Sequence, residues 1–143
     1  EAYNHFVSRS KAPGAFDSRA NDTGENNLFG TSTTDNNHFT ITAALHDSTA
    51  NQDVYVENAK IVTMMNPMNY LGSPAATNAR FYRIRYGTAD SNTSVAIPLI
   101  VGTRAQNLGY RVDMATPFNV DHSGDYDLEE LFNWMDNIVK NGR

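Results

Sequence analysis

The sequence Tyr82-Arg-Ile-Arg-Tyr-Gly-Thr-Ala-Asp90 decides the fold class. From residue 81 to residue 86 the side chains alternate between two faces, as they do in a half-buried strand. One face carries Tyr82, Ile84 and Tyr86, and the other carries Phe81, Arg83 and Arg85. Gly87-Thr88 then turns the chain. The stretch therefore predicts a strand followed by a loop that carries the carboxylate of Asp90.

A helix and a second strand follow this loop. Residues 94–108 are typical of a helix that Asn92, Thr93 or Ser94 caps, with Pro98 tolerated only within about the first turn. Gly109 ends it, and residues 110–116 alternate again as a second strand. Strand, helix and strand in this order predict the right-handed crossover that is typical of parallel sheets.

The last element of the chain is an amphipathic helix. Asp127 is expected to cap it, Glu130 to complete a capping box, and Gly142 to close it. Its apolar stripe consists of Leu128, Leu131, Phe132, Met135, Ile138 and Val139. That stripe needs a surface to cover, and two strands form only a marginal sheet. We therefore expect the remaining strands to come from another polypeptide segment.

The first part of the chain has a different character. Residues 1–53 are rich in Asn, Asp, Ser, Thr and Gly and show no sustained periodicity, which favours loops with a short helix over residues 39–46. A second helix is expected over residues 54–65, where apolar residues recur at spacings of three. Asn66-Pro67 should end it, because the residue before proline is pushed out of helical geometry.

Asp90 and His122 carry the chemistry that the sequence predicts. Both follow a strand, and functional groups collect at the carboxyl ends of parallel strands. Taken alone, Asp90 is an ordinary Asx-turn residue and His122 a surface histidine. Taken together they resemble two thirds of a Ser-His-Asp triad, in which the carboxylate orients a histidine that acts as general base.

The nucleophile of such a triad is missing from this chain. Neither Gly30-Thr-Ser nor Gly72-Ser-Pro completes the Gly-x-Ser-x-Gly turn that exposes a nucleophilic serine. The order Asp before His, with Ser upstream, agrees with the order in α/β-hydrolases. We therefore expect the carboxyl-terminal part of a serine hydrolase, inactive as a fragment because the serine lies on the upstream polypeptide.

Composition excludes several other classes. The 143 residues carry a net charge of −5, which favours neither nucleic acid nor an anionic membrane surface, and no apolar run is long enough to span a bilayer. The absence of cysteine excludes disulfides and thiol nucleophiles. It does not fix the cellular compartment, and a secreted or periplasmic bacterial protein is compatible with it. No cofactor is expected.

Metal binding is not expected either. The histidines other than His122 have no partner at a metal-ligand spacing, so they are interpreted as solvated or locally bonded side chains; they are His5, His38 and His46. The acidic residues around His122 lack an EF-hand pattern, and helix capping accounts for Asp127. The methionines at positions 64, 65 and 68 are expected to fill the core or to line a pocket.

Several stretches resemble bacterial tannase-like esterases, which are α/β-hydrolases with a large lid insertion. The end of that family is matched by Phe81-Tyr-Arg-Ile-Arg-Tyr-Gly-Thr-Ala-Asp90-Ser-Asn-Thr-Ser-Val-Ala-Ile-Pro98 and by Asp121-His-Ser-Gly-Asp-Tyr-Asp-Leu-Glu-Glu-Leu-Phe-Asn-Trp134. Its lid-to-core segment is matched by Lys11-Ala-Pro-Gly-Ala-Phe16-Asp, Gly24-Glu-Asn-Asn-Leu-Phe-Gly30 and His38-Phe-Thr40.

The resemblance implies an α/β architecture for this chain. Residues 54–143 would be the carboxyl-terminal part of an α/β-hydrolase core, with its last two parallel strands and their helices. Residues 1–53 would be a remnant of the lid or insertion region that contributes to the substrate pocket.

The resemblance also implies the site residues and the substrate class. Asp90 would be the triad acid and His122 the general base, while Lys11 and Glu25 would bind the hydroxyls of a galloyl ring. The family has a third binding residue, an aspartate, where this chain has Asn92, so a galloyl ester, a feruloyl-type ester or another small ester is the expected substrate. The alternative is a ligand-binding or structural module derived from the esterase fold and without catalysis.

Overall fold

The computed structural model describes residues 17–30, 33, 35–49, 59–122 and 124–142. The elements are, in chain order, α2 (Gly24–Asn27), α3 (Ile41–Leu45), α4 (Ala59–Met65), the 3₁₀ helix η1 (Pro67–Asn69), β1 (Phe81–Arg85), α5 (Ala96–Asn107), β2 (Arg111–Ala115) and α6 (Leu128–Asn141). None of the helices in these ranges has the length and apolar character that crossing a membrane requires. Lys11 and residues 54–58, the start of one expected helix, lie outside the described part.

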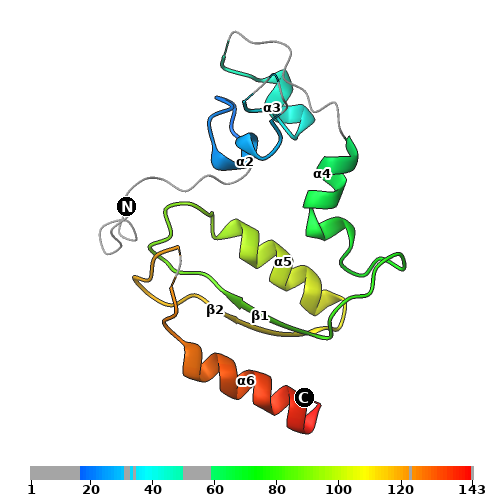
Figure 1. The fold of residues 1–143 in the computed structure, drawn as a ribbon, viewed down its shortest axis with the longest axis vertical. Helices are drawn as coiled ribbons and strands as arrows, with labels where there is room; N and C mark the ends of the chain where they lie inside the picture. Colours follow the sequence, from blue (N-terminus) through cyan, green and yellow to red (C-terminus); the bar gives the residue numbers. More distant parts are fainter. Residues whose placement is uncertain (1–16, 31–32, 34, 50–58, 123, 143) are drawn as a thin grey trace.

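The expected strand, helix and strand are present. β1 and β2 pair in parallel, with Phe81 opposite Arg111 and Arg85 opposite Ala115, and α5 connects them. Figure 1 shows α5 lying along one side of the two strands. Ile84 and Met114 project toward α5 at Gly102, where an added Cβ would lie only 2.8 Å from the Met114 sulfur. Close packing of helix on sheet therefore depends on a small residue at this position.

Of the three residues expected to cap α5, Ser94 does so, because its Oγ accepts a hydrogen bond from the N–H of Ala96 at 3.3 Å. The position directly before the helix is Val95, whose backbone is already helical and whose side chain makes no capping hydrogen bond. The backbone N–H groups of Asn92 and Thr93 donate to Asp90 instead, so these two residues belong to the loop. Pro98 is the third helical residue, within the first turn as predicted, and the chain leaves the helix at Gly109 with a φ of +82°.

The expected capping box of α6 is also wrong. Asp127 stands at the capping position without a side-chain capping bond, because its carboxylate accepts hydrogen bonds from Arg83 (2.7 Å) and Arg85 (3.1 Å) of β1. Glu130 likewise accepts from Arg83 at 3.3 Å. Asp113 of β2 pairs with both arginines, and the hydrogen bond from Arg83 holds the pKa of Asp127 below its usual value. Gly142 ends α6 in a left-handed conformation, as predicted.

α6 leaves its apolar stripe open. The helix lies on the side of the strands opposite α5 (Figure 1), and the described residues of α6 include none that is buried. Phe132 is 59% exposed and Val139 is 84% exposed. An apolar face of this kind marks a surface that another protein segment covers.

The 143 residues expressed alone are expected to lack a cooperative unfolding transition. The described residues form a sheet of two strands, and four of the six residues of the α6 stripe are exposed, namely Leu128, Phe132, Met135 and Val139. Thermal unfolding followed by circular dichroism, together with the molecular mass in solution, checks this expectation. A soluble monomer that unfolds in one sharp transition would contradict it.

The two helices expected before the sheet are present within the described residues. Thr40 caps α3 by accepting from the N–H of Ala43, so this helix is shorter than the expected range of residues 39–46. α4 ends at Met65, and Asn66 is extended before Pro67, as predicted. These segments lie on the α5 side of the sheet (Figure 1).

Candidate active site

Asp90 lies buried in the loop that follows β1. Its Oδ1 accepts hydrogen bonds from the backbone N–H groups of Asn92 (2.7 Å) and Thr93 (2.9 Å), which is the Asx-turn arrangement. Burial alone would raise the pKa of Asp90, but these two bonds and the one to His122 outweigh it and hold the pKa below its usual value. The side chain is therefore an ionised, fixed acceptor.

His122 meets this carboxylate from the loop after β2. Its Nδ1 lies 3.0 Å from Oδ2 and 3.1 Å from Oδ1 of Asp90, and its backbone N–H donates to Asp121 at 2.7 Å. Because an ionised carboxylate only accepts hydrogen bonds, Nδ1 carries the proton and the lone pair of a neutral ring is on Nε2. The side chain is 48% exposed. This geometry presents a basic nitrogen from a ring that a buried carboxylate orients.

Backbone contacts between the two loops hold this pair together. Ala89 N–H donates to the carbonyl of Val120 at 2.9 Å, and Thr88 N–H donates to that of Pro117 at 3.0 Å. At Gly87 the loops come so close that an added Cβ would lie 2.1 Å from the Val120 oxygen. Only glycine allows this approach, so the sequence signal Gly87-Thr88 marks more than a turn.

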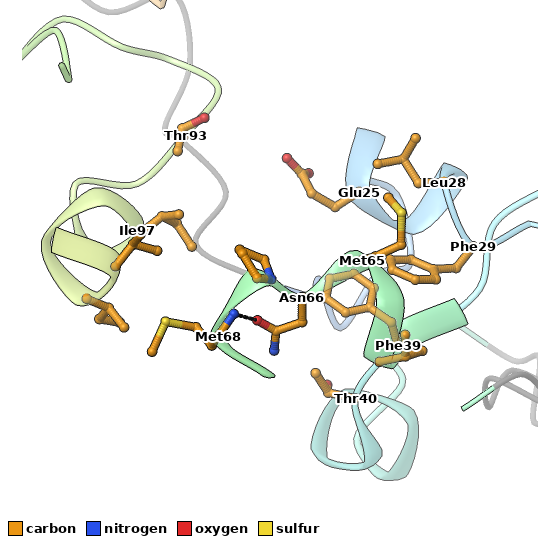
Figure 2. A pocket seen from close by; sticks show the side chains of 14 residues that line it. Glu25, Leu28, Phe29, Phe39, Thr40, Met65, Asn66, Met68, Thr93 and Ile97 are labelled. Atoms are coloured by element: carbon orange, nitrogen blue, oxygen red, sulfur yellow. Dashed lines mark hydrogen bonds between the residues drawn. The ribbon is translucent and has the colours of Figure 1, made fainter. Parts of the chain in front are cut away.

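A cavity of about 500 Å³ is lined by residues of α2, α4, η1 and α5 and by the segment that precedes α3. Figure 2 shows the aromatic rings of Phe29 and Phe39 on one side of it and Ile97 of α5 on another. Fourteen residues line it: Glu25, Leu28, Phe29, Phe39, Thr40, Val62, Met65, Asn66, Pro67, Met68, Thr93, Ile97, Ile100 and Val101. Thr93, whose N–H donates to Asp90, lines this cavity from the Asp90 loop, whereas Asp90 and His122 themselves are not among the lining residues.

Of the two expected binding residues that the structure describes, one lines this cavity and the other does not. Glu25 lines it from α2, while Asn92 is exposed and is not among the lining residues. Met65 and Met68 line the wall, which agrees with one of the two functions expected for the methionines. Met64 is exposed.

A second histidine with carboxylate partners, His38, was not predicted from the sequence. His38 is fully buried, and its two ring nitrogens contact Asp17 at 2.8 Å and Asp47 at 2.7 Å. The partners lie 21 and 9 residues away in the chain, so no local motif announces them. No group of His, Asp or Glu in the described ranges is arranged to hold a metal ion. His5 lies outside the described residues, and His46 is exposed.

Fold and site together define part of an α/β protein with a carboxylate–histidine pair at the carboxyl ends of two parallel strands. No family model matches the chain, and no curated protein matches it. Several solved structures match it. The tannase from Lactobacillus plantarum is 39% identical with a TM-score of 0.78, over 93% of this chain and 28% of its own. The Fusobacterium nucleatum tannase is 44% identical with a TM-score of 0.77, over 96% of this chain and 29% of its own.

A third structure, a tannin acyl hydrolase in complex with ethyl gallate, is 40% identical with a TM-score of 0.77, over 93% of this chain and 28% of its own. These matches to tannase structures, over nearly the whole of this chain, confirm the resemblance seen in the sequence. The chain spans less than a third of the length of the tannases it matches, as a fragment of such a protein would.

Proposed function

We propose that this chain is the carboxyl-terminal part of a serine carboxylic-ester hydrolase with the α/β-hydrolase fold. The observation that carries the proposal is the contact between Asp90 and His122, each placed after one of two parallel strands. The nucleophilic serine is assigned to the upstream polypeptide. The chain by itself therefore has the acid and the base of the triad but no group for the base to activate.

In the proposed reaction, His122 Nε2 accepts the hydroxyl proton as the serine oxygen attacks the ester carbonyl. The tetrahedral intermediate then collapses, the bond to the alcohol oxygen breaks, and His122 returns its proton to that oxygen. A water molecule, deprotonated by His122, attacks the acyl-serine, and the serine recovers its proton as the acid leaves. Asp90 keeps the ring in one tautomer and stabilises the imidazolium that forms twice in this cycle.

The proposed substrate is a small phenolic ester of galloyl or feruloyl type. Related proteins of this family have been solved with ethyl gallate and with 3,4-dihydroxybenzoate, both of which are hydroxylated aromatic compounds. Glu25 lines the cavity beside the Asp90 loop, and a carboxylate accepts hydrogen bonds from phenolic hydroxyls. The proposal adds Lys11 and Asn92 as further contacts to the hydroxyl groups, as the family resemblance implies.

Hydrolysis of methyl gallate, methyl ferulate and simple acetate esters by the intact protein tests this function. We expect turnover of at least one aryl ester and its loss after treatment with a serine-directed phosphonate. Binding of the phenolic acids without turnover of any ester would favour the alternative, a ligand-binding module derived from the esterase fold.

Replacing Asn92 by Asp is expected to shift the preference of the intact protein toward galloyl esters. A carboxylate accepts a hydroxyl proton more strongly than a neutral amide does, with a gain of about tenfold in relative kcat/KM for each 1.4 kcal/mol. The ratio of kcat/KM for methyl gallate and for a monohydroxylated ester measures the effect. Asn107→Asp, at the exposed end of α5, is the matched control for the added charge. An unchanged ratio would remove Asn92 from the binding site.

A further inference from the structure

The buried cluster around His38 joins segments that precede α2 and follow α3. His38 has no exposed surface; its Nδ1 lies 2.8 Å from Oδ1 of Asp17 and its Nε2 lies 2.7 Å from Oδ2 of Asp47. Asp17 lies seven residues before the first residue of α2, and Asp47 lies two residues after the last residue of α3. One imidazole thus connects two chain segments. Arg19 joins the same segments, since its Nε donates to the carbonyl of His46 and its own carbonyl accepts from Ser48 N–H at 2.8 Å.

The hydrogen bonds require a positively charged ring. Oδ2 of Asp17 accepts from the N–H groups of Phe39 and Thr40, both at 2.8 Å, and the other oxygen of Asp47 accepts from Thr49. These bonds and those to His38 hold the pKa of both aspartates below the usual value, so both carboxylates are ionised acceptors and both nitrogens of His38 donate. Burial by itself lowers the pKa of His38, but the bonds to the two aspartates and their negative charge raise it above its usual value on balance.

The same aspartate fixes a wall of the cavity. Besides binding the backbone of Phe39 and Thr40, Asp17 accepts from the hydroxyl of Thr40 at 3.0 Å, and that hydroxyl accepts from Ala43 N–H to cap α3. The ring of Phe39 stacks on that of Phe29 with centroids 4.6 Å apart, and both rings and Thr40 line the cavity (Figure 2). If the ring of His38 lost its positive charge, the two negatively charged aspartates would face each other across a neutral ring without compensation.

We propose that Asp17, His38 and Asp47 form a proton-dependent clamp that holds the cavity wall of Phe29, Phe39 and Thr40, and that release of the His38 proton to solvent loosens this wall. The inference goes beyond the proposed ester hydrolysis and does not depend on it. Arg19 is the other described cation near the cluster, and its Nε donates to the carbonyl of His46 at 2.9 Å. The neutral amide of Asn26 in α2 completes the surroundings by donating to Asp17.

The pKa directions define the pH range of the clamp. The pKa of His38 is raised from 6.5, so its stabilising contribution is complete below 6.5 and is lost as the pH rises through the higher folded value. For Asp17, burial raises the pKa, but the hydrogen bonds from His38 and its neighbours lower it below 3.8. For Asp47, the bonds from Thr49 and His38 also lower it below 3.8. The clamp is therefore complete between pH 3.8 and pH 6.5 and opens as the pH rises through the folded pKa of His38.

Hydrogen exchange of the intact protein, followed by mass spectrometry between about pH 6 and about pH 10, tests the clamp. After correction for intrinsic exchange, protection of peptides from residues 35–49 should fall with rising pH, by up to about tenfold for each unit by which folding raises the pKa of His38. Protection of β1 and β2 should not follow this profile. A corrected protection of residues 35–49 that does not change across the range overturns the proposal.

Variants separate the clamp from a general loss of structure. His38→Gln should give low protection of residues 35–49 that no longer depends on pH, whereas His46→Gln, the exposed histidine of the same segment, should keep the profile of the unmodified protein. Asp47→Asn removes one carboxylate and should move the loss of protection to lower pH. This variant tests the proposal if His38→Gln does not fold. A wild-type profile in either His38→Gln or Asp47→Asn would contradict the inference.

Discussion

Replacement of His122 by alanine is expected to lower kcat for aryl esters by about four to six orders of magnitude in the intact protein. His122 is the proposed base and acid of both half-reactions, and its nearest charged partner, Asp90, cannot take its place because Asp90 is buried and bound to backbone N–H groups. Kinetics with methyl gallate and methyl ferulate measure the loss.

The fold should survive this change. The imidazole of His122 is 48% exposed and lies in a loop, so its removal leaves no large cavity. Thermal unfolding of the variant and of the unmodified protein should therefore nearly coincide. His46→Ala is the matched control, because His46 is an exposed histidine at the end of α3, and it should keep full activity. Undiminished turnover by the His122 variant would rule out the triad.

The sequence predicted the strands and helices around this pair because their signals are local. Alternating side chains defined β1 and β2, and proline and glycine defined the carboxyl-terminal ends of α4 and α5. The bounds of both strands and these two helix ends agree with the structure within a few residues. The carboxyl ends of parallel strands lie at the same edge of a sheet, so the loops of Asp90 and His122 could be expected to meet. Topology brings the two loops to the same edge, and the backbone contacts between them then set the contact between Asp90 and His122.

Long-range charge pairing is what the sequence concealed. Asp127 and Glu130 fit a capping box, but Arg83 and Arg85, more than 40 positions earlier in the chain, compete for the same carboxylates. Charge-assisted bonds to arginine are stronger than bonds to a neutral backbone N–H, so the arginines prevail. The environment of His38 could not be predicted for the same reason, because no residue near it in the sequence indicates that it pairs with two aspartates in a buried site.

Gly87→Ala should reduce turnover by about two orders of magnitude, although Gly87 touches no substrate in the proposed reaction. An added Cβ would lie 2.1 Å from the Val120 oxygen and 2.6 Å from the Asp121 oxygen, distances that only a backbone shift can relieve. Both obstructing atoms are backbone atoms of the segment that leads directly into His122. The loop after β2 must therefore move away from the loop after β1, and the imidazole moves with it.

The kinetics should distinguish this displacement from unfolding. Separation of His122 from Asp90 affects the proton transfers, so kcat should fall while KM changes little, and the thermal midpoint should decrease only modestly. Gly24→Ala is the matched control, because an added Cβ at Gly24 meets nothing within 4 Å. Equal kcat values for the Gly87 and Gly24 variants would mean that the contact between the two loops does not set the position of His122. In that case the hydrogen bonds from Ala89 and Thr88 to the second loop would have to hold the pair without the close approach at Gly87.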